Sequence, residues 1–129
     1  MKGSKLAVVL LLGILIVASI ACGGKTVNES NSGSQIYLSV GETFVVKLAS
    51  NPSTGYSWNL SAITNTSIIN KTSNAYIPPS VQIPGRGGQE TWKFQALSVG
   101  TATISMKYIQ PWEPEAEPAD TFEITVSVK

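Results

Sequence analysis

The chain has 129 residues, of which 43% are hydrophobic, which suits one small globular domain with short appendages. It has no histidine and a single cysteine, so the commonest general base near neutral pH is missing and no intramolecular disulfide can form. No cluster of Lys and Arg is present that would attract nucleic acid. These absences argue against an enzyme, a metal site or a nucleic-acid-binding protein, and we expect no cofactor.

The first 22 residues have the layout of an export signal. Lys2 and Lys5 precede an almost unbroken apolar run over residues 6–20. A run of roughly 15 residues is short for a membrane span, which needs roughly 20. We therefore expect residues 1–22 to be a signal segment, with an uncleaved membrane anchor as the alternative. Without Lys2 and Lys5 the nine basic residues fall to seven against eight acidic ones, a net charge of about −1.

Cys22, the only cysteine, suggests how the exported chain is held. It follows residues 19–21 in an arrangement that resembles a lipoprotein processing site, where the cysteine becomes the lipidated mature N-terminus. Ser19 stands where such sites usually carry an aliphatic residue. We expect lipidation at Cys22, with plain signal cleavage as the alternative. The protein would then be exported and anchored by its N-terminus to a membrane, at the cell surface or in the periplasm.

Two kinds of segment follow the signal. Residues 23–34 are rich in Gly, Ser and Asn without apolar periodicity, which predicts a flexible tether. From residue 35 to 129 apolar and polar residues alternate, which predicts strands with one buried and one solvated face. The residues that share a face in each strong run are Phe44, Val46 and Leu48; Tyr56, Trp58 and Leu60; Trp92, Phe94 and Ala96; Ala102, Ile104, Met106 and Tyr108; and Phe122, Ile124, Val126 and Val128.

These runs predict an all-β fold for residues 35–129, namely an immunoglobulin-like antiparallel β-sandwich of about seven strands. Residues 36–40 add a short strand, and weaker runs lie at residues 68–69 and 75–77. Trp58 and Trp92 fall on the apolar alternation, so both are expected in the core. Since no disulfide is available, the core must be held by apolar packing alone.

Three loops between the predicted strands are rich in Pro and Gly: residues 51–56, 84–88 and 110–114. They follow alternate strands, so in an up-and-down order they emerge at the same end of the sandwich. Stiff loops on a rigid scaffold are where binding is usually located. The sequence therefore predicts a binding edge made of these three loops, and no active site.

The first loop has a conformational reason for each of its residues. Pro52 fixes its own φ, and Gly55 can take the positive φ of a chain reversal. Ser53 and Thr54 are expected at the tip with free hydroxyls. Trp112 in the third loop lies between two prolines and beside acidic residues, which makes it a poor core residue and a candidate anchor.

Residues 35–129 resemble the chagasin family of cysteine protease inhibitors, small immunoglobulin-like proteins that block papain-like enzymes. The family's first motif, Asn-Pro-Thr-Thr-Gly-Tyr/Phe, is matched at residues 51–56 with Ser53 in place of the first threonine. Its Gly-x-Gly-Gly element is matched at residues 85–88. Its Arg-Pro-Trp element is matched in part at residues 110–112, where Gln110 replaces the arginine.

The resemblance implies a reversible inhibitor that occludes the cleft of a papain-like cysteine protease without covalent chemistry. The first loop would cover the catalytic Cys–His pair, the middle loop would lie along the substrate-binding side, and Trp112 would pack on the leaving-group side. The residues implied to bind the protease are Asn51, Pro52, Ser53, Thr54, Gly55, Tyr56, Gly85, Arg86, Gly87, Gly88, Gln110, Pro111 and Trp112. A monomer is expected.

Some alternatives stay open at this point. Arg86 is either a solvated charge at a loop tip or a contact to an acidic subsite. The loss of the arginine at Gln110 leads us to expect a changed target preference and not a loss of inhibition. The chief rival function is a non-inhibitory immunoglobulin-like binding or adhesion module at the cell surface.

Overall fold

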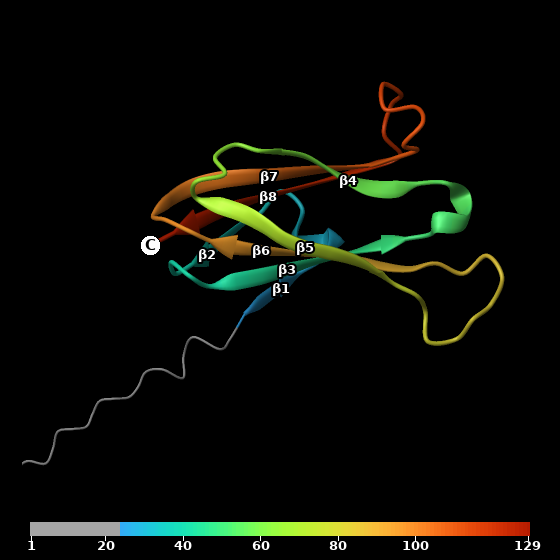
Figure 1. Ribbon diagram of the computed structural model, residues 1–129, viewed down its shortest axis with the longest axis horizontal. Helices are drawn as coiled ribbons and strands as arrows, with labels where there is room; N and C mark the ends of the chain where they lie inside the picture. The colour runs from blue at the N-terminus through green and yellow to red at the C-terminus, as the bar shows by residue number, and fades with distance from the viewer. Residues whose placement is uncertain (1–23) are drawn as a thin grey trace, which may run out of the picture.

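A computed structural model of the protein describes residues 24–129, so the predicted signal segment and Cys22 lie outside the described residues. Two four-stranded sheets pack face to face, with strand orders β1-β3-β6-β5 and β2-β8-β7-β4 (Figure 1). The strands are β1 (Lys25–Val27), β2 (Gln35–Leu38), β3 (Thr43–Ser50), β4 (Ser57–Ile63), β5 (Ile69–Ile77), β6 (Gly88–Ala96), β7 (Gly100–Ile109) and β8 (Asp120–Val128). This architecture confirms the predicted all-β, immunoglobulin-like sandwich.

The period-two pattern of the sequence produces the core. In β3 the side chains of Phe44, Val46 and Leu48 are buried, while their neighbours along the strand point outward. The ring of Phe44 stacks on that of Phe94 in β6, with centroids 5.3 Å apart. This is a cross-strand pair within one sheet, and the buried side chains of both sheets join in a single core cluster, as expected for aligned sheet packing. The same alternation buries Trp58 and Trp92, which confirms the prediction that both are core residues.

The flexible tether predicted for residues 23–34 is wrong for most of its length. Residues 25–27 form β1, which pairs with β3, and the side chain of Val27 is buried. A short 3-10 helix, η3 (Glu29–Asn31), follows and is closed by a capping box with Asn28. The carboxylate of Glu29 accepts a hydrogen bond from the backbone N–H of Ala49 at the end of β3. Three residues are too few to show periodicity, so only the tertiary pairing with β3 reveals this strand.

The predicted antiparallel sandwich carries two parallel strand pairs at its edges. β1 pairs with β3 in parallel, and β2 pairs with β8 in parallel. The remaining pairs, β3–β6, β5–β6, β4–β7 and β7–β8, are antiparallel as predicted. β1 and β2 are edge strands of different sheets. The chain crosses to the second sheet through β2 and returns to the first as β3, so β1 and β3 run in the same direction, while β2 lies beside β8 from the far end of the chain. β1 and β2 bring the number of strands to eight.

The sandwich has two unlike ends. The loops after β3, β5 and β7 emerge together at one end, as the strand order predicts (Figure 1). We call this the loop end; it consists of residues 51–56, 78–87 and 110–119. The opposite, turn end consists of the short turns at residues 39–42 and 97–99. Within residues 24–129, no helix is long and apolar enough to cross a membrane.

Candidate functional site

The first loop of the loop end is a single 3-10 turn, η4 (Pro52–Thr54), whose polar side chains fold back on its own backbone. Asn51 caps the turn, and its Oδ1 accepts hydrogen bonds from the N–H (3.3 Å) and Oγ (2.7 Å) of Ser53. Thr54 Oγ1 donates to the carbonyl of Asn51 at 2.6 Å. Gly55 ends the turn at a φ of +85°, which glycine adopts without strain.

These contacts correct the prediction that the two hydroxyls at the loop tip are free. Both Ser53 and Thr54 are exposed, yet each donates its hydroxyl proton within the loop. Each oxygen keeps acceptor capacity toward solvent or a partner. The hydroxyls therefore stiffen the loop first, and only their remaining lone pairs face outward.

The middle loop packs directly against the first. Asn51 Nδ2 donates to the carbonyl of Gly85 at 2.8 Å. At Gly87 an added Cβ would lie 2.6 Å from the carbonyl oxygen of Ser50 and 2.9 Å from Cβ of Asn51. Only a glycine permits this approach, because such distances are far inside van der Waals contact. Gly88, predicted as a loop residue, is instead the first residue of β6, where it pairs with Ser50.

The third loop reaches the first through Trp112. A Cβ built on Gly55 would lie 2.5 Å from Cη2 of Trp112, so the indole rests on the glycine backbone. The Trp112 side chain is nevertheless 65% exposed. An exposed indole that is held on one face by backbone has the form of an interface anchor. The predicted site residues of all three loops are therefore brought together on one surface.

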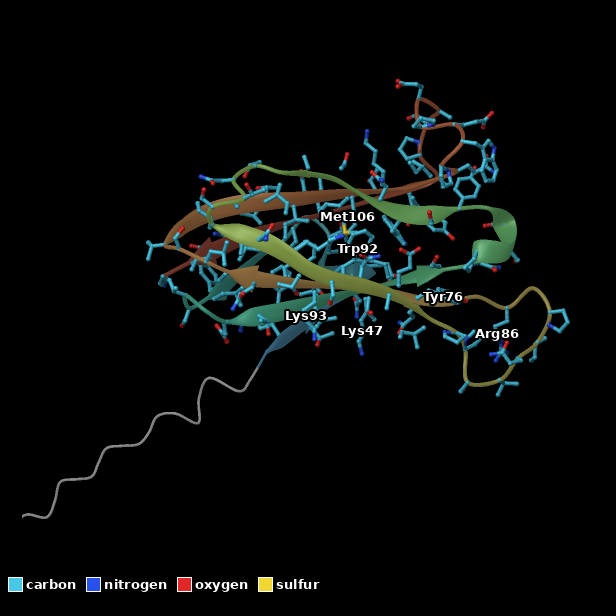
Figure 2. All side chains as sticks on the ribbon, in the orientation of Figure 1. Lys47, Tyr76, Arg86, Trp92, Lys93 and Met106 are labelled. Carbon is cyan, nitrogen blue, oxygen red and sulfur yellow. The ribbon has the colours of Figure 1, made fainter. Side chains whose placement is uncertain are left out.

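Arg86 lies in the middle loop of this surface and is exposed, with its side chain extending from the loop (Figure 2). The neighbouring side chains of Val81 and Ile83 are also largely exposed. Gln110 and Pro111 lead into Trp112, and the turn that follows is closed by a hydrogen bond from the N–H of Glu113 to the carbonyl of Gln110 at 2.9 Å. The middle loop thus offers apolar and basic contacts, and the third loop an aromatic one.

Beneath the first loop lies a buried carboxylate that the sequence analysis did not single out. Glu90 of β6 is 8% exposed. Its Oε2 accepts from Ser50 Oγ at 2.7 Å and from the N–H of Trp58 at 3.0 Å, and its Oε1 accepts from Trp92 Nε1 at 3.3 Å. Ser50 is the last residue of β3 and Trp58 is the second residue of β4, so Glu90 is hydrogen-bonded to the strands on both sides of the first loop, which are its stems. In the sequence, Glu90 could have been recognised as an acidic residue on the apolar face of its strand, two positions before Trp92.

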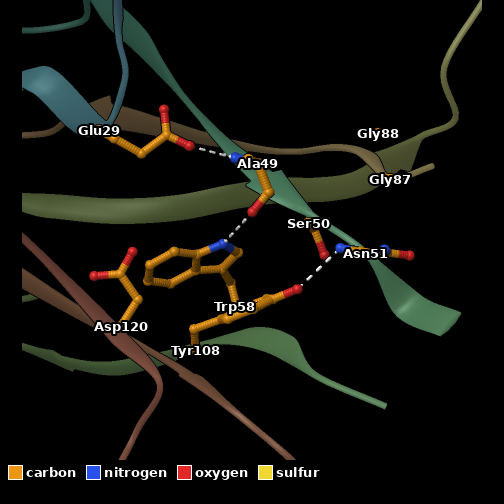
Figure 3. A pocket seen from close by; sticks show the side chains of 9 residues that line it. All are labelled: Glu29, Ala49, Ser50, Asn51, Trp58, Gly87, Gly88, Tyr108 and Asp120. Carbon is orange, nitrogen blue, oxygen red and sulfur yellow. Dashed lines mark hydrogen bonds between the residues drawn. The ribbon is translucent and has the colours of Figure 1, made fainter. Parts of the chain in front are cut away.

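Aromatic side chains support the same stems from the other sheet. The hydroxyl of Tyr108 accepts from the N–H of Asn51 at 2.9 Å, and the ring of Tyr108 lies 5.4 Å from Tyr56 and 5.1 Å from Trp58, centroid to centroid. Trp58 Nε1 donates to the carbonyl of Ala49 at 3.0 Å, as Figure 3 shows. Among the described residues, no buried side-chain nitrogen or oxygen lacks a hydrogen-bond partner.

A cleft of about 440 Å³ opens beside these aromatic residues and is lined in part by Glu29, Trp58, Tyr108 and Asp120 (Figure 3). Within this cleft, the carboxylate of Glu29 accepts the hydrogen bond from the backbone N–H of Ala49. Over residues 24–129, no group of three or more His, Cys, Asp or Glu side chains is placed to hold a metal ion. The three loops, stiffened by their internal bonds and carrying exposed side chains, have the character of a binding surface.

Comparison with known proteins gives a consistent picture. Residues 37–126 match the family described as Chagasin family peptidase inhibitor I42. The chain is 28% identical over 101 residues to chagasin from Trypanosoma cruzi (76% of this chain and 92% of that protein), and 31% identical over 102 residues to amoebiasin-2 from Entamoeba histolytica (78% and 82%). Its fold resembles that of PbICP-C, solved in complex with falcipain-2, with a TM-score of 0.61, 22% identity and coverage of 83% of this chain and 90% of that one.

Proposed function

This chain belongs to the chagasin family of peptidase inhibitors, and we propose that its loop end blocks the active-site cleft of papain-like cysteine proteases. It is an inhibitor and not an enzyme, like the relatives that define the family. The observation that carries the proposal is the single surface made by the three loops. Asn51 of the first loop is hydrogen-bonded to Gly85 of the middle loop, and Trp112 of the third loop packs on Gly55 of the first.

The first loop enters the cleft and covers the catalytic Cys–His pair. Its 3-10 turn, its cap and its two internal hydroxyl bonds leave few alternative conformations. Docking therefore costs little conformational entropy, which favours tight binding by occlusion alone. The same rigidity protects the loop from cleavage, because a protease needs an extended segment that fits its subsites as a strand.

The other two loops hold the inhibitor in place on either side of the catalytic pair. The middle loop lies along the substrate-binding side, where exposed Val81, Ile83 and Arg86 contact the enzyme. The third loop places the exposed indole of Trp112 on the leaving-group side. Gln110 offers neutral hydrogen bonds where an arginine would supply a charge, so proteases with acidic groups at that place are bound less tightly.

The protein acts outside the cytoplasm as a monomer, held at a membrane through its N-terminus. The support for export and anchoring comes from the sequence: two lysines, the apolar run at residues 6–20 and Cys22 directly after it. The domain that follows carries no other cysteine, as suits a chain without disulfides. A lipid on Cys22 would leave the loop end free to meet a protease.

The test is a titration of papain activity with the chain from residue 24 onward, since β1 belongs to the domain. We expect reversible, stoichiometric inhibition. Trp112→Ala should weaken it about tenfold or more, equivalent to about 1.4 kcal/mol, while thermal stability is kept because the side chain is exposed. Thr101→Ala, an exposed substitution near the turn end, is the control and should inhibit like the unaltered chain. A folded chain that leaves papain and related cysteine proteases fully active would favour an adhesion module.

A further inference from the structure

The chain enters the domain at the turn end. β1 runs parallel to β3, so its first residue, Lys25, pairs with Phe44 near the start of β3, beside the turn at residues 39–42 (Figure 1). A Cβ on Gly24 would lie 3.2 Å from the carbonyl oxygen of Thr43, which places Gly24 against the same turn. The described chain therefore begins, at Gly24, on the side opposite the three binding loops.

Very little chain separates that point from the expected anchor. Only residues 23 and 24 stand between Cys22 and the first residue of β1. The three residue steps from Cys22 to Lys25 reach at most about 11 Å when fully extended. An anchor at Cys22, or an uncleaved apolar segment ending near residue 21, would thus hold the turn end directly at the membrane surface. A flexible tether over residues 23–34 would have let the domain rotate freely relative to its anchor, whereas β1 holds this part of the chain against the domain.

The turn end carries exposed apolar side chains that no other part of the domain covers. Val40, Leu97 and Val99 are 50%, 45% and 69% exposed. The two turns that carry them are bonded to one another, because the N–H of Gly41 donates to the carbonyl of Ala96 at 2.8 Å. Three exposed aliphatic side chains thus lie on adjoining turns at one end of the domain, and we call them the apolar patch.

Side chains of the kind found at lipid headgroups also lie beside the turn end. Tyr37, 54% exposed, lies at the end of β2, and the ammonium of Lys129 is 5.3 Å from its ring centroid. Tyrosine and lysine place apolar atoms in the interface while their polar ends stay in water. Lys25 is exposed at the same end. The acid there, Glu42, accepts a hydrogen bond from the N–H of Ser39 within its turn.

Charge separates the two ends of the domain. The loop end holds Glu113, Glu115 and Glu117, with Arg86 as its basic residue, and Asp120 begins β8 directly after it. An anionic membrane surface repels this end and attracts the lysines of the other. Electrostatics and apolar contact therefore favour the same orientation.

We propose that the turn end is a lipid-contacting surface, with Val40, Leu97 and Val99 resting in the interface of the bilayer and the inhibitory loops facing away from it. The proposal depends on the proposed N-terminal anchoring. The anchor and the patch then have separate roles. The anchor holds the domain at the membrane, and the patch fixes the orientation of the domain there. A protease then approaches the loops from the aqueous side without obstruction by lipid.

The test uses the full chain, produced with its export segment and reconstituted in vesicles of phosphatidylcholine and phosphatidylglycerol that carry a spin-labelled lipid quencher. A fluorophore is attached to Val99→Cys at the turn end or to Ala116→Cys at the loop end, both exposed positions. The unaltered chain, whose one cysteine is Cys22, gives the background of labelling. We expect strong lipid quenching at position 99, and at position 116 quenching only by an aqueous agent such as iodide.

A second variant separates orientation from anchoring. A triple variant removes the patch without opening the core, since all three side chains are exposed: Val40→Ser, Leu97→Ser and Val99→Ser. The fluorophore is placed on Ser98→Cys both in this background and in the chain that keeps the patch. We expect both chains to float with the vesicles, and lipid quenching at residue 98 to be lost only in the triple variant. Equal lipid quenching at both ends, or unchanged quenching in the triple variant, would overturn the proposal, as would a chain that does not float. Papain inhibition measured on the same samples in detergent reports on the inhibitor function separately.

Discussion

The loop end and the turn end of this sandwich are built from the same strands but are stabilised in different ways. At the turn end, backbone bonds join the short turns, the side-chain bonds are made by exposed residues such as Glu42, and apolar side chains such as Val99 are left exposed. At the loop end, side chains satisfy the backbone: Asn51 caps the first loop, and Tyr108 and Glu90 bind its stems. The contrast teaches that irregular loops become rigid when buried polar groups tie their stems to the core.

This difference matters for inhibition because a rigid loop loses little entropy on docking. It also separates two kinds of stability within one domain. A substitution at the turn end should lower the free energy of unfolding without changing the binding surface. A substitution in the polar network at the loop end should change both, and the predictions below use pairs of variants to exploit that distinction.

The largest effect is expected from a pair of glycines with the same backbone conformation. Gly55 and Gly41 have φ values of +85° and +92°, so alanine at either position costs about 1–2 kcal/mol of stability. At Gly55 the new Cβ would also displace Trp112, whereas at Gly41 no atom lies within 4 Å. We predict that Gly55→Ala weakens papain inhibition about 100-fold, or about 2.7 kcal/mol, and that Gly41→Ala leaves it unchanged. Inhibition constants and urea unfolding of both variants provide the check. Equal inhibition by the two variants would show that binding does not depend on the packing of Trp112 against Gly55.

A smaller effect is expected when the buried carboxylate is altered. Glu90→Gln keeps the shape of the side chain but replaces one acceptor oxygen with an NH₂ group that faces the donors Ser50 or Trp92, at a cost of about 1–3 kcal/mol. Val128→Ala, in the core near the turn end, should cost on the order of 2 kcal/mol through its cavity.

These two variants differ in what happens to inhibition. We predict that Glu90→Gln weakens binding to papain about tenfold, because both stems of the first loop loosen, while Val128→Ala binds normally below its melting temperature. The measurement is the inhibition constant of each variant at a temperature where both are folded. Normal binding by Glu90→Gln at a reduced melting temperature would assign that carboxylate a purely structural role.

The smallest effect is a gain. Gln110→Arg introduces a charge beside Trp112, and we predict about threefold tighter inhibition of proteases with acidic residues on the leaving-group side, since an exposed ion pair contributes roughly 0.2–1 kcal/mol. Gln35→Arg adds the same charge at an exposed position of β2 and is the control. The comparison should be made at low and high salt, because screening abolishes such a gain. An equal gain from both variants would reflect net charge and not the position of residue 110.

The sequence predicted the sandwich because its alternation is strong where strands are long. Phe44, Val46 and Leu48 identify a buried face with no knowledge of their partners, and Trp112 between prolines indicates an exposed loop residue. The strand order then predicted that the three loops share one end. These features depend on local pattern, which a single sequence records directly.

What escaped prediction depends on contacts distant in the sequence. β1 has three residues and is defined only by its partner β3, so residues 23–34 looked like a tether. Glu90 looked like one more acid until Ser50 and Trp58 were found around its carboxylate. The hydroxyl of Thr54 seemed free because its acceptor, the carbonyl of Asn51, comes within reach only when the turn closes.

The central claim is that the loop end covers the catalytic cysteine of the protease. The most direct measurement is the rate at which iodoacetamide alkylates that cysteine in papain, with and without the chain from residue 24 onward, which has no cysteine of its own. The account predicts that one equivalent of inhibitor protects the thiol, and that Gly55→Ala at the same concentration protects it far less. Alkylation at an undiminished rate while the complex is intact would place the inhibitor elsewhere on the enzyme and contradict occlusion by the loops.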